Sequence, residues 1–159
     1  MPLIQMIIKD TPIGCIGLSA SENALVRLDF LRDSPQGTST AGNAVLELAK
    51  EQIKAYFAGQ LKAFSVPLAP EGTVFQLAVW RQLSLIPYGE TRSYGNIAEA
   101  LGQPGAARAV GMANNRNPLP LVIPCHRVIG ADGQLVGFGG GLDIKQQLLA
   151  LEHPQLQLF

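Results

Sequence analysis

Cys125 stands between Pro124 and His126, immediately after the apolar run LPLVI. The proline restricts the backbone and so fixes the direction in which the thiol points. A thiolate is a nucleophile, and it forms near neutral pH only where a neighbouring base, cation or dipole lowers the thiol pKa from about 8.5. Cys125 is therefore a candidate nucleophile, and a buried inert thiol is the alternative.

Two further residues could act with this thiol. His126 could be its base, but consecutive side chains usually point apart, so we expect a bridging water to carry the proton. Glu152 lies four residues after Leu148, at the edge of the apolar stripe of a C-terminal helix, where an unpaired carboxylate is costly. Glu152 is either an exposed charge at the helix end or the group that orients a histidine in a nucleophile–base–carboxylate relay.

Other chemistry finds less support in the sequence. Cys15 lies in an apolar strand and is expected to serve packing, and two cysteines do not make a disulfide scaffold. Neither cysteine forms a CxxC pair and the two histidines, His126 and His153, have no HxxxH spacing, so we expect no metal site. The run GFGGG lacks the strand–GxGxxG–helix setting of a nucleotide site, and no cofactor is expected.

Composition limits the classes of protein. The chain has 159 residues, 12 Lys+Arg against 12 Asp+Glu, and 47% hydrophobic residues, which suits one folded domain or two small ones. No stretch approaches the roughly 18 apolar residues of a membrane span, and the N-terminus lacks a basic region, so we expect a cytoplasmic protein. Residues 100–131 contain no acidic residue but include Arg108, Arg116 and Arg127. This cationic segment indicates either a local anionic partner or a chance distribution in a chain with few charges.

The first half of the chain predicts a small sheet and one helix. Residues 12–20 and 24–30 alternate in polarity and predict a hairpin. Asn43 is a plausible cap for an amphipathic helix that ends at Gly59, and a short strand is expected at 64–68. The segment APEGT is the expected boundary between two parts of the chain.

The second half is mostly helical. Thr73 can cap a helix that stops at Pro87, and two further helices, the first capped by Ser93, flank the turn at 103–105 in a helix-turn-helix pattern. The prolines after residue 117 forbid a helix, and a strand at 119–123 with a turn at Asp132–Gly133 predicts a β-wing. Asp143 is expected to cap the last helix.

The helix that follows this turn is unusual in composition. Its small residues surround one long side chain, Arg108. Reading bases in the major groove requires several Arg, Asn or Gln side chains, whereas small residues let a helix backbone approach phosphates and groove walls closely. We therefore expect weakly sequence-dependent DNA binding, with close packing in the interior as the alternative. The small residues are Ala106, Ala107, Ala109, Gly111 and Ala113.

Three segments together resemble the O6-alkylguanine-DNA alkyltransferases, also called methylated-DNA–protein-cysteine methyltransferases. They are LVIPCHRVIG, AARAVGMANNRNP and TRSYG. The pentapeptide PCHRV alone would arise by chance at roughly one start in a few million. The resemblance covers residues 73–153 firmly. It implies an α+β protein with an N-terminal ribonuclease-H-like domain (1–70) and a C-terminal winged helix-turn-helix-like domain (73–159).

The resemblance also implies a reaction. An alkyl group of O6-alkylguanine, or of O4-methylthymine, would pass irreversibly to Cys125, without cofactor or turnover. His126 would deprotonate the thiol through a water, and Glu152 would polarise His126. Tyr94 would donate a hydrogen bond or proton to the leaving guanine. Asn117 would tie the recognition helix to the active-site turn.

The implied partner is double-stranded DNA with alkylated bases, bound by a monomer through the minor groove with little sequence specificity. Arg108 would fill the gap left by the flipped nucleotide. The base pocket would be formed by backbone groups of Cys125, Val128 and Gly139, with Pro120 and Phe138 as its walls. Relatives often have tyrosine and serine where this chain has Phe138 and Gly139, which should change the tolerance for bulky alkyl groups. The helix residues expected at DNA are Ser93, Ala106, Ala107, Arg108, Ala109 and Gly111.

Three other functions compete with this one. A non-enzymatic alkyltransferase-like protein would bind the lesion, but such proteins replace the cysteine, usually by tryptophan. A winged-helix regulator would need sequence-specific readout and a dimer interface, which the Ala-rich helix does not support. A Cys–His hydrolase needs a histidine distant in sequence, for which only His153 is available.

Overall fold

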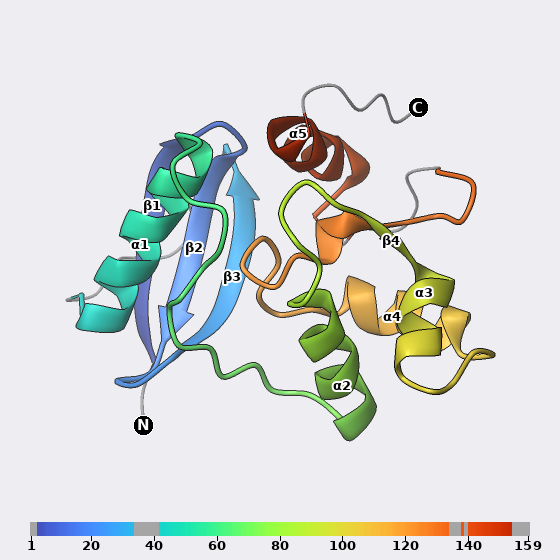
Figure 1. The fold of residues 1–159 in the computed structure, drawn as a ribbon. Helices are drawn as coiled ribbons and strands as arrows, with labels where there is room; N and C mark the ends of the chain where they lie inside the picture. The colour runs from blue at the N-terminus through green and yellow to red at the C-terminus, as the bar shows by residue number, and fades with distance from the viewer. Residues whose placement is uncertain (1–2, 34–41, 134–137, 139, 154–159) are drawn as a thin grey trace. The chain divides into compact units, whose positions relative to one another are not determined.

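The computed structural model describes residues 3–33, 42–133, 138 and 140–153. Two compact units divide the chain, the first comprising residues 1–71 and the second residues 72–159. Within the described ranges, no helix combines the length and apolar character needed to cross a membrane. The α+β fold class is confirmed, with a sheet and a helix in the first unit and mostly helices in the second (Figure 1).

The first unit is built on an antiparallel sheet in the order β1–β2–β3, formed by Ile4–Thr11, Gly14–Ala20 and Leu25–Arg32. The predicted hairpin is confirmed as β2 and β3. Sequence analysis missed β1, because its nearly continuous apolar run IQMII hides the alternation that buries Met6 and Ile8.

Helix α1 (Ala44–Phe57) packs on this sheet (Figure 1). Asn43 caps it as predicted, with its side chain accepting from Leu46 N at 2.8 Å. The prediction of a strand at 64–68 is wrong, because only a single bridge, from Leu68 to Leu25, forms in this segment. The side chain of Gln52 instead takes the N–H groups of residues 65 and 66, each at 3.1 Å, and a proline at 67 has no N–H to offer a ladder.

The second unit carries four α-helices and one short 3-10 helix, η1, among its described residues (Figure 1). Thr73 and Ser93 both cap helices through capping boxes, closed by Gln76 and Asn96, because their hydroxyls reach backbone N–H groups three residues on. The elements in order are α2 (Val74–Leu83), β4 (Arg92–Ser93), α3 (Tyr94–Ala100), α4 (Ala107–Asn115), η1 (Cys125–Arg127), β5 (Val128–Ile129) and α5 (Leu142–Glu152).

The structure corrects three predictions in this unit. Helix α2 ends at Leu83, one turn before the expected proline. Residues 119–123 form a turn with one bridge instead of a strand, because Asn117 binds its backbone. The last helix begins at Leu142 after Gly141, whose φ of 101° suits glycine, so Asp143 lies in the first turn and is not the cap.

The predicted wing is described only in part. Strand β5 pairs in parallel with β4, and Gly133 N donates to Gly130 O at 2.9 Å to close the expected turn. The continuation of the wing at 134–137 lies outside the described residues.

Candidate active site

Cys125 begins the short helix η1 and is buried, with 3% of its surface exposed. Its backbone N–H donates to Ile123 O at 2.7 Å. The side chain of Asn117 holds the preceding turn: Nδ2 donates to Ile123 O at 2.8 Å, and Oδ1 accepts from Leu119 N at 2.9 Å. Leu121 in this turn has a φ of 77°, a strained conformation for a branched side chain. The thiol is therefore carried by a turn that Asn117 braces.

Burial governs the charge state of the thiol. Desolvation raises the pKa of Cys125 to about 11. The hydrogen bond from Asn117, the charge of Lys145 and the backbone hydrogen bonds of Cys125 and Leu121 lower this pKa, but their combined effect is smaller than that of desolvation. The thiol is therefore protonated near neutral pH. A nucleophilic reaction at this sulfur requires a base that removes the proton as the reaction proceeds.

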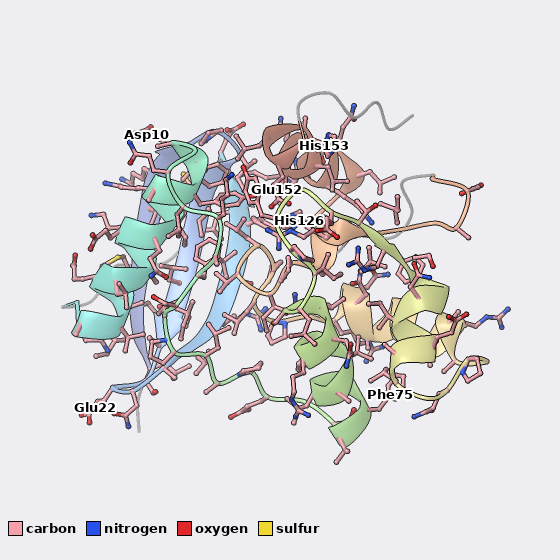
Figure 2. The ribbon with its side chains drawn as sticks, viewed as in Figure 1. Asp10, Glu22, Phe75, His126, Glu152 and His153 are labelled. Atoms are coloured by element: carbon pink, nitrogen blue, oxygen red, sulfur yellow. The ribbon has the colours of Figure 1, made fainter. Side chains whose placement is uncertain are left out.

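His126 and Glu152 form a buried pair (Figure 2), with Nε2 and Oε2 2.7 Å apart. Burial raises the pKa of Glu152, but hydrogen bonds from His126 and Arg127 outweigh it and lower that pKa to about 2. The anionic carboxylate accepts, so Nε2 of the imidazole must donate. Burial lowers the pKa of His126, so the ring is neutral and Nδ1 keeps its lone pair. Nδ1 is buried without a hydrogen-bond partner among the described residues, and it can accept a proton.

Arg127 is a member of the site that sequence analysis did not identify. Its Nε donates to Glu152 Oε1 at 2.7 Å, Nη2 donates to Oε2 at 2.9 Å, and Nη1 donates to Ile86 O at 2.7 Å. Glu152 is buried and is not an exposed charge at a helix end. The missed signal was an arginine inside the apolar segment VIPCHRVI, because an arginine there is buried only with a partner.

Lys145 was also missed, because it reads as a polar-face residue of a helix. It is fully buried, and its Nζ donates to Val128 O at 2.5 Å. Burial lowers its pKa to about 8, partly opposed by the charge of Cys125. Val128 N in turn donates to Cys125 O. Backbone groups of Cys125 and Val128 were predicted to hold a base edge. The carbonyl oxygens of both residues already accept one hydrogen bond each, and each has a second lone pair.

Tyr94 begins α3, directly after Ser93, which pairs with Ile129 of β5. Tyr94 is half-buried, and its pKa is raised by burial and by the charge of Cys125. Gly111 of α4 lies against the Tyr94 ring, where an added Cβ would stand 3.8 Å from Cδ1 and Cε1. The structure therefore brings Cys125, His126, Glu152, Asn117 and Tyr94 into one region of the second unit.

The residues predicted to contact DNA differ in exposure. Arg108 and Ala109 are exposed on α4, and Met112, which sequence analysis did not identify, is 57% exposed. The hydroxyl of Ser93 accepts from Asn96 N at 3.0 Å and so serves as a cap. The other residues predicted to contact DNA are half-buried: Ser93, Ala106, Ala107 and Gly111.

The predicted pocket walls are described in part. Pro120 and Phe138 are half-buried, and Val128 is buried. The prediction for Gly139 lies outside the described residues. In the part of the chain that is described, no three His, Cys, Asp or Glu side chains come together as metal ligands.

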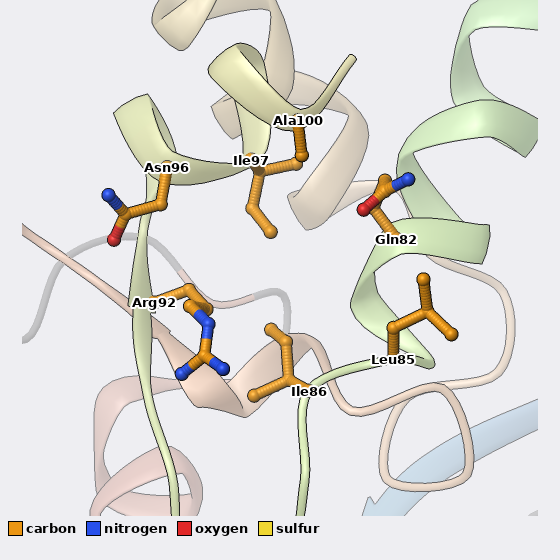
Figure 3. Close-up of a pocket in the computed structure, with 7 residues that line it drawn as sticks. All are labelled: Gln82, Leu85, Ile86, Arg92, Asn96, Ile97 and Ala100. Atoms are coloured by element: carbon orange, nitrogen blue, oxygen red, sulfur yellow. The ribbon is translucent and has the colours of Figure 1, made fainter.

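A separate surface pocket of about 490 Å³ lies between α2 and α3 (Figure 3). The pocket wall includes Ile86, whose carbonyl oxygen accepts a hydrogen bond from Arg127. Ile86 therefore lies between the pocket and the buried ion pair of Arg127 and Glu152. Neither Cys125 nor Tyr94 lines the pocket. Its described lining is Gln82, Leu85, Ile86, Arg92, Asn96, Ile97 and Ala100.

The second unit combines a buried thiol in a braced turn, a histidine–carboxylate pair and two helices joined by a turn. This combination is typical of a DNA-binding protein with a candidate cysteine nucleophile. Two family models match: the ribonuclease-like domain of 6-O-methylguanine DNA methyltransferase at 5–70, and its DNA binding domain at 74–154. The chain belongs to the 6-O-methylguanine DNA methyltransferase family, which confirms the resemblance seen in the sequence.

Individual relatives agree over nearly the whole chain. A methylated-DNA–protein-cysteine methyltransferase of Methanosarcina acetivorans is 50% identical over 91% of this chain and 96% of its own. One of Mycolicibacterium paratuberculosis is 52% identical over 94% and 93%. A crystal structure of Mycobacterium tuberculosis OGT in complex with DNA has a TM-score of 0.85 and 47% identity, covering 94% of this chain and 92% of that one.

Proposed function

We propose that this protein repairs DNA by direct reversal, transferring the alkyl group of O6-alkylguanine to Sγ of Cys125. The observation that carries the proposal is the buried His126 ring, whose Nε2 binds Glu152 at 2.7 Å while Nδ1 stays unpartnered among the described residues. Relatives about 50% identical over most of the chain are named for this reaction.

The reaction conserves atoms and charge without a cofactor. The S–C bond forms as the bond between the alkyl carbon and O6 of guanine breaks. The thiol proton passes through a water to Nδ1 of His126, while Tyr94 supplies a proton to the ring of the leaving guanine. The proton on His126 then returns to the Tyr94 oxygen through solvent, so both side chains end neutral. A neutral base departs, and the thioether on Cys125 is stable, so each molecule acts once.

The proposed partner is duplex DNA that contains alkylated bases, bound by a monomer in the cytoplasm. Exposed Arg108 and Ala109 on α4 support docking in the minor groove, because small residues permit close approach and the arginine can replace a flipped nucleotide. Residues 73–159 would carry this activity as one domain and residues 1–70 would form the other. Pro120, Val128, Phe138 and Gly139 would surround the base.

The test uses a duplex oligonucleotide with one O6-methylguanine and the intact mass of the protein, followed by mapping of the modified peptide. We expect one added methyl group per molecule, located on Cys125 and saturating at one equivalent. The matched control Cys125→Ser should bind the same duplex and gain no mass. An unchanged mass despite tight binding would leave a lesion-sensing protein, and methylation of Cys15 instead would contradict the assigned acceptor.

A further inference from the structure

Asn114 in α4 carries a buried amide that the described protein does not satisfy. Its exposed surface is 1%, and neither Nδ2 nor Oδ1 has a hydrogen-bond partner in the residues that the structure describes. Buried side-chain amides in folded proteins nearly always have partners, because a donor or acceptor removed from water without one destabilises the fold. An orphaned donor and acceptor on one side chain therefore require an explanation.

The contrast with Asn117 shows that this orphan is local. Asn117 stands three residues further on and uses both ends of its amide, donating to Ile123 O and accepting from Leu119 N. The turn before Cys125 thus takes its bracing from Asn117. Asn114 is not needed for that bracing, and its amide remains available for another group.

The position of Asn114 on α4 relates it to Tyr94. It follows Gly111 by three residues, so the two lie on one face of α4. Gly111 lies against the Tyr94 ring, and Tyr94 is the residue proposed to supply a proton to the leaving guanine. The face of α4 that carries Asn114 is therefore the one that lies against the Tyr94 ring.

We propose that the Asn114 amide contacts the purine base held at Cys125 and contributes to the choice of base. This inference rests on the proposed function. The oxygen can accept from the exocyclic amino group of guanine, or the nitrogen can donate to the ring nitrogen N7. These two groups lie on opposite edges of the purine, so the amide contacts one of them, and the analogues in the test identify which. Among the described residues both ends of this amide lack a partner, and the base supplies a partner to one end when it enters.

The test compares Asn114→Leu, which keeps the approximate size and removes the polar atoms, with Asn115→Leu, the same change at the exposed next position of α4. Single-turnover rates of methyl transfer are measured by intact mass on duplexes with O6-methylguanine, O6-methylhypoxanthine, which lacks the amino group, and O6-methyl-7-deazaguanine, which lacks N7. Thermal unfolding of each protein is measured in parallel.

We expect Asn114→Leu to slow transfer from O6-methylguanine about tenfold, the scale of one lost hydrogen bond. The slowing should shrink on the analogue that lacks the contacted group. The unfolding midpoint should stay the same or rise, because no buried amide is left unsatisfied, and Asn115→Leu should match the unaltered protein. An unchanged rate, an equal loss on all three bases, or a lower midpoint together with a slower rate would overturn the proposal.

The same assay separates this inference from the proposed function. If the unaltered protein transfers no methyl group, the proposed function fails. The Asn114 contact is then judged by affinity, as the preference for the O6-methylguanine duplex over an undamaged duplex. A reduced preference in Asn114→Leu supports the contact, and an equal preference overturns it.

Discussion

Glu152→Gln tests whether the buried carboxylate stabilises the second unit through its charge. The substitution keeps the shape and removes the negative charge, so the guanidinium of Arg127, only 7% exposed, is left buried without its counterion. Removing one partner of a buried ion pair costs about 3–5 kcal/mol. We therefore expect urea unfolding at pH 7 to show a loss of free energy of unfolding of this size.

The pH dependence of stability gives a second value for the contribution of the Glu152 carboxylate to the free energy of unfolding. The pKa of Glu152 falls from 4.5 to about 2 in the folded protein, and at about 1.36 kcal/mol per pH unit this corresponds to about 3 kcal/mol. Because the folded pKa is lowered, the contribution is complete above about pH 4.5 and is lost as the pH falls towards 2. The difference between Glu152→Gln and the unaltered protein should shrink over this range.

A double-mutant cycle with Arg127→Met isolates the pair. Each single change leaves one buried charge, whereas the double change removes both, so the double variant should be more stable than the sum of the single effects predicts by about 2 kcal/mol or more. Urea unfolding at pH 7 measures all four proteins. A loss below about 0.5 kcal/mol for Glu152→Gln, with an unchanged pH profile, would refute the reasoning.

Three further substitutions test the fold and the site. Gly14→Ala places a Cβ 2.6 Å from a β3 carbonyl and should cost over about 2 kcal/mol in urea unfolding, against about 1 for the control Gly59→Ala, which meets no atom within 4 Å; equal losses would contradict this. Trp80→Phe removes a 2.8 Å hydrogen bond to α4 and should lower the free energy of unfolding by about 1–2 kcal/mol; an unchanged urea midpoint would contradict this. Lys145→Met removes a positive charge that favours the thiolate form of Cys125, so it should slow methyl transfer to Cys125 about tenfold at pH 7. The difference in rate should narrow above about pH 8, where Lys145 loses its proton; a rate equal to that of the unaltered protein would exclude this electrostatic role.

Local signals in the sequence were sufficient for several elements. Asn43, Thr73 and Ser93 cap helices where predicted, because a capping side chain reaches only the N–H groups two or three residues on. The β2–β3 hairpin followed from alternating polarity. Cys125 and His126 were identified as candidate catalytic residues from their setting in PCHRV, and the family to which the chain belongs followed from that motif and its partners.

Predictions failed where long-range contacts outweighed the local pattern. The strand expected at 64–68 is replaced by backbone bonds to Gln52, a residue of α1. The strand expected at 119–123 is replaced by a turn that the side chain of Asn117 holds. In both cases a side-chain amide took backbone groups that a sheet would have paired, and residue patterns do not show which amide will reach them.

The sequence by itself determined the capped helices, the hairpin and the candidate reactive residues Cys125 and His126, because these depend on neighbours a few positions apart. Only the tertiary structure decided that Glu152 meets both His126 and Arg127, that Lys145 is buried on the Val128 carbonyl, and that the amide of Asn114 is left unpartnered among the described residues. Desolvation and ion pairing depend on which segments pack together. The same Glu and Lys would be ordinary surface charges on an isolated helix.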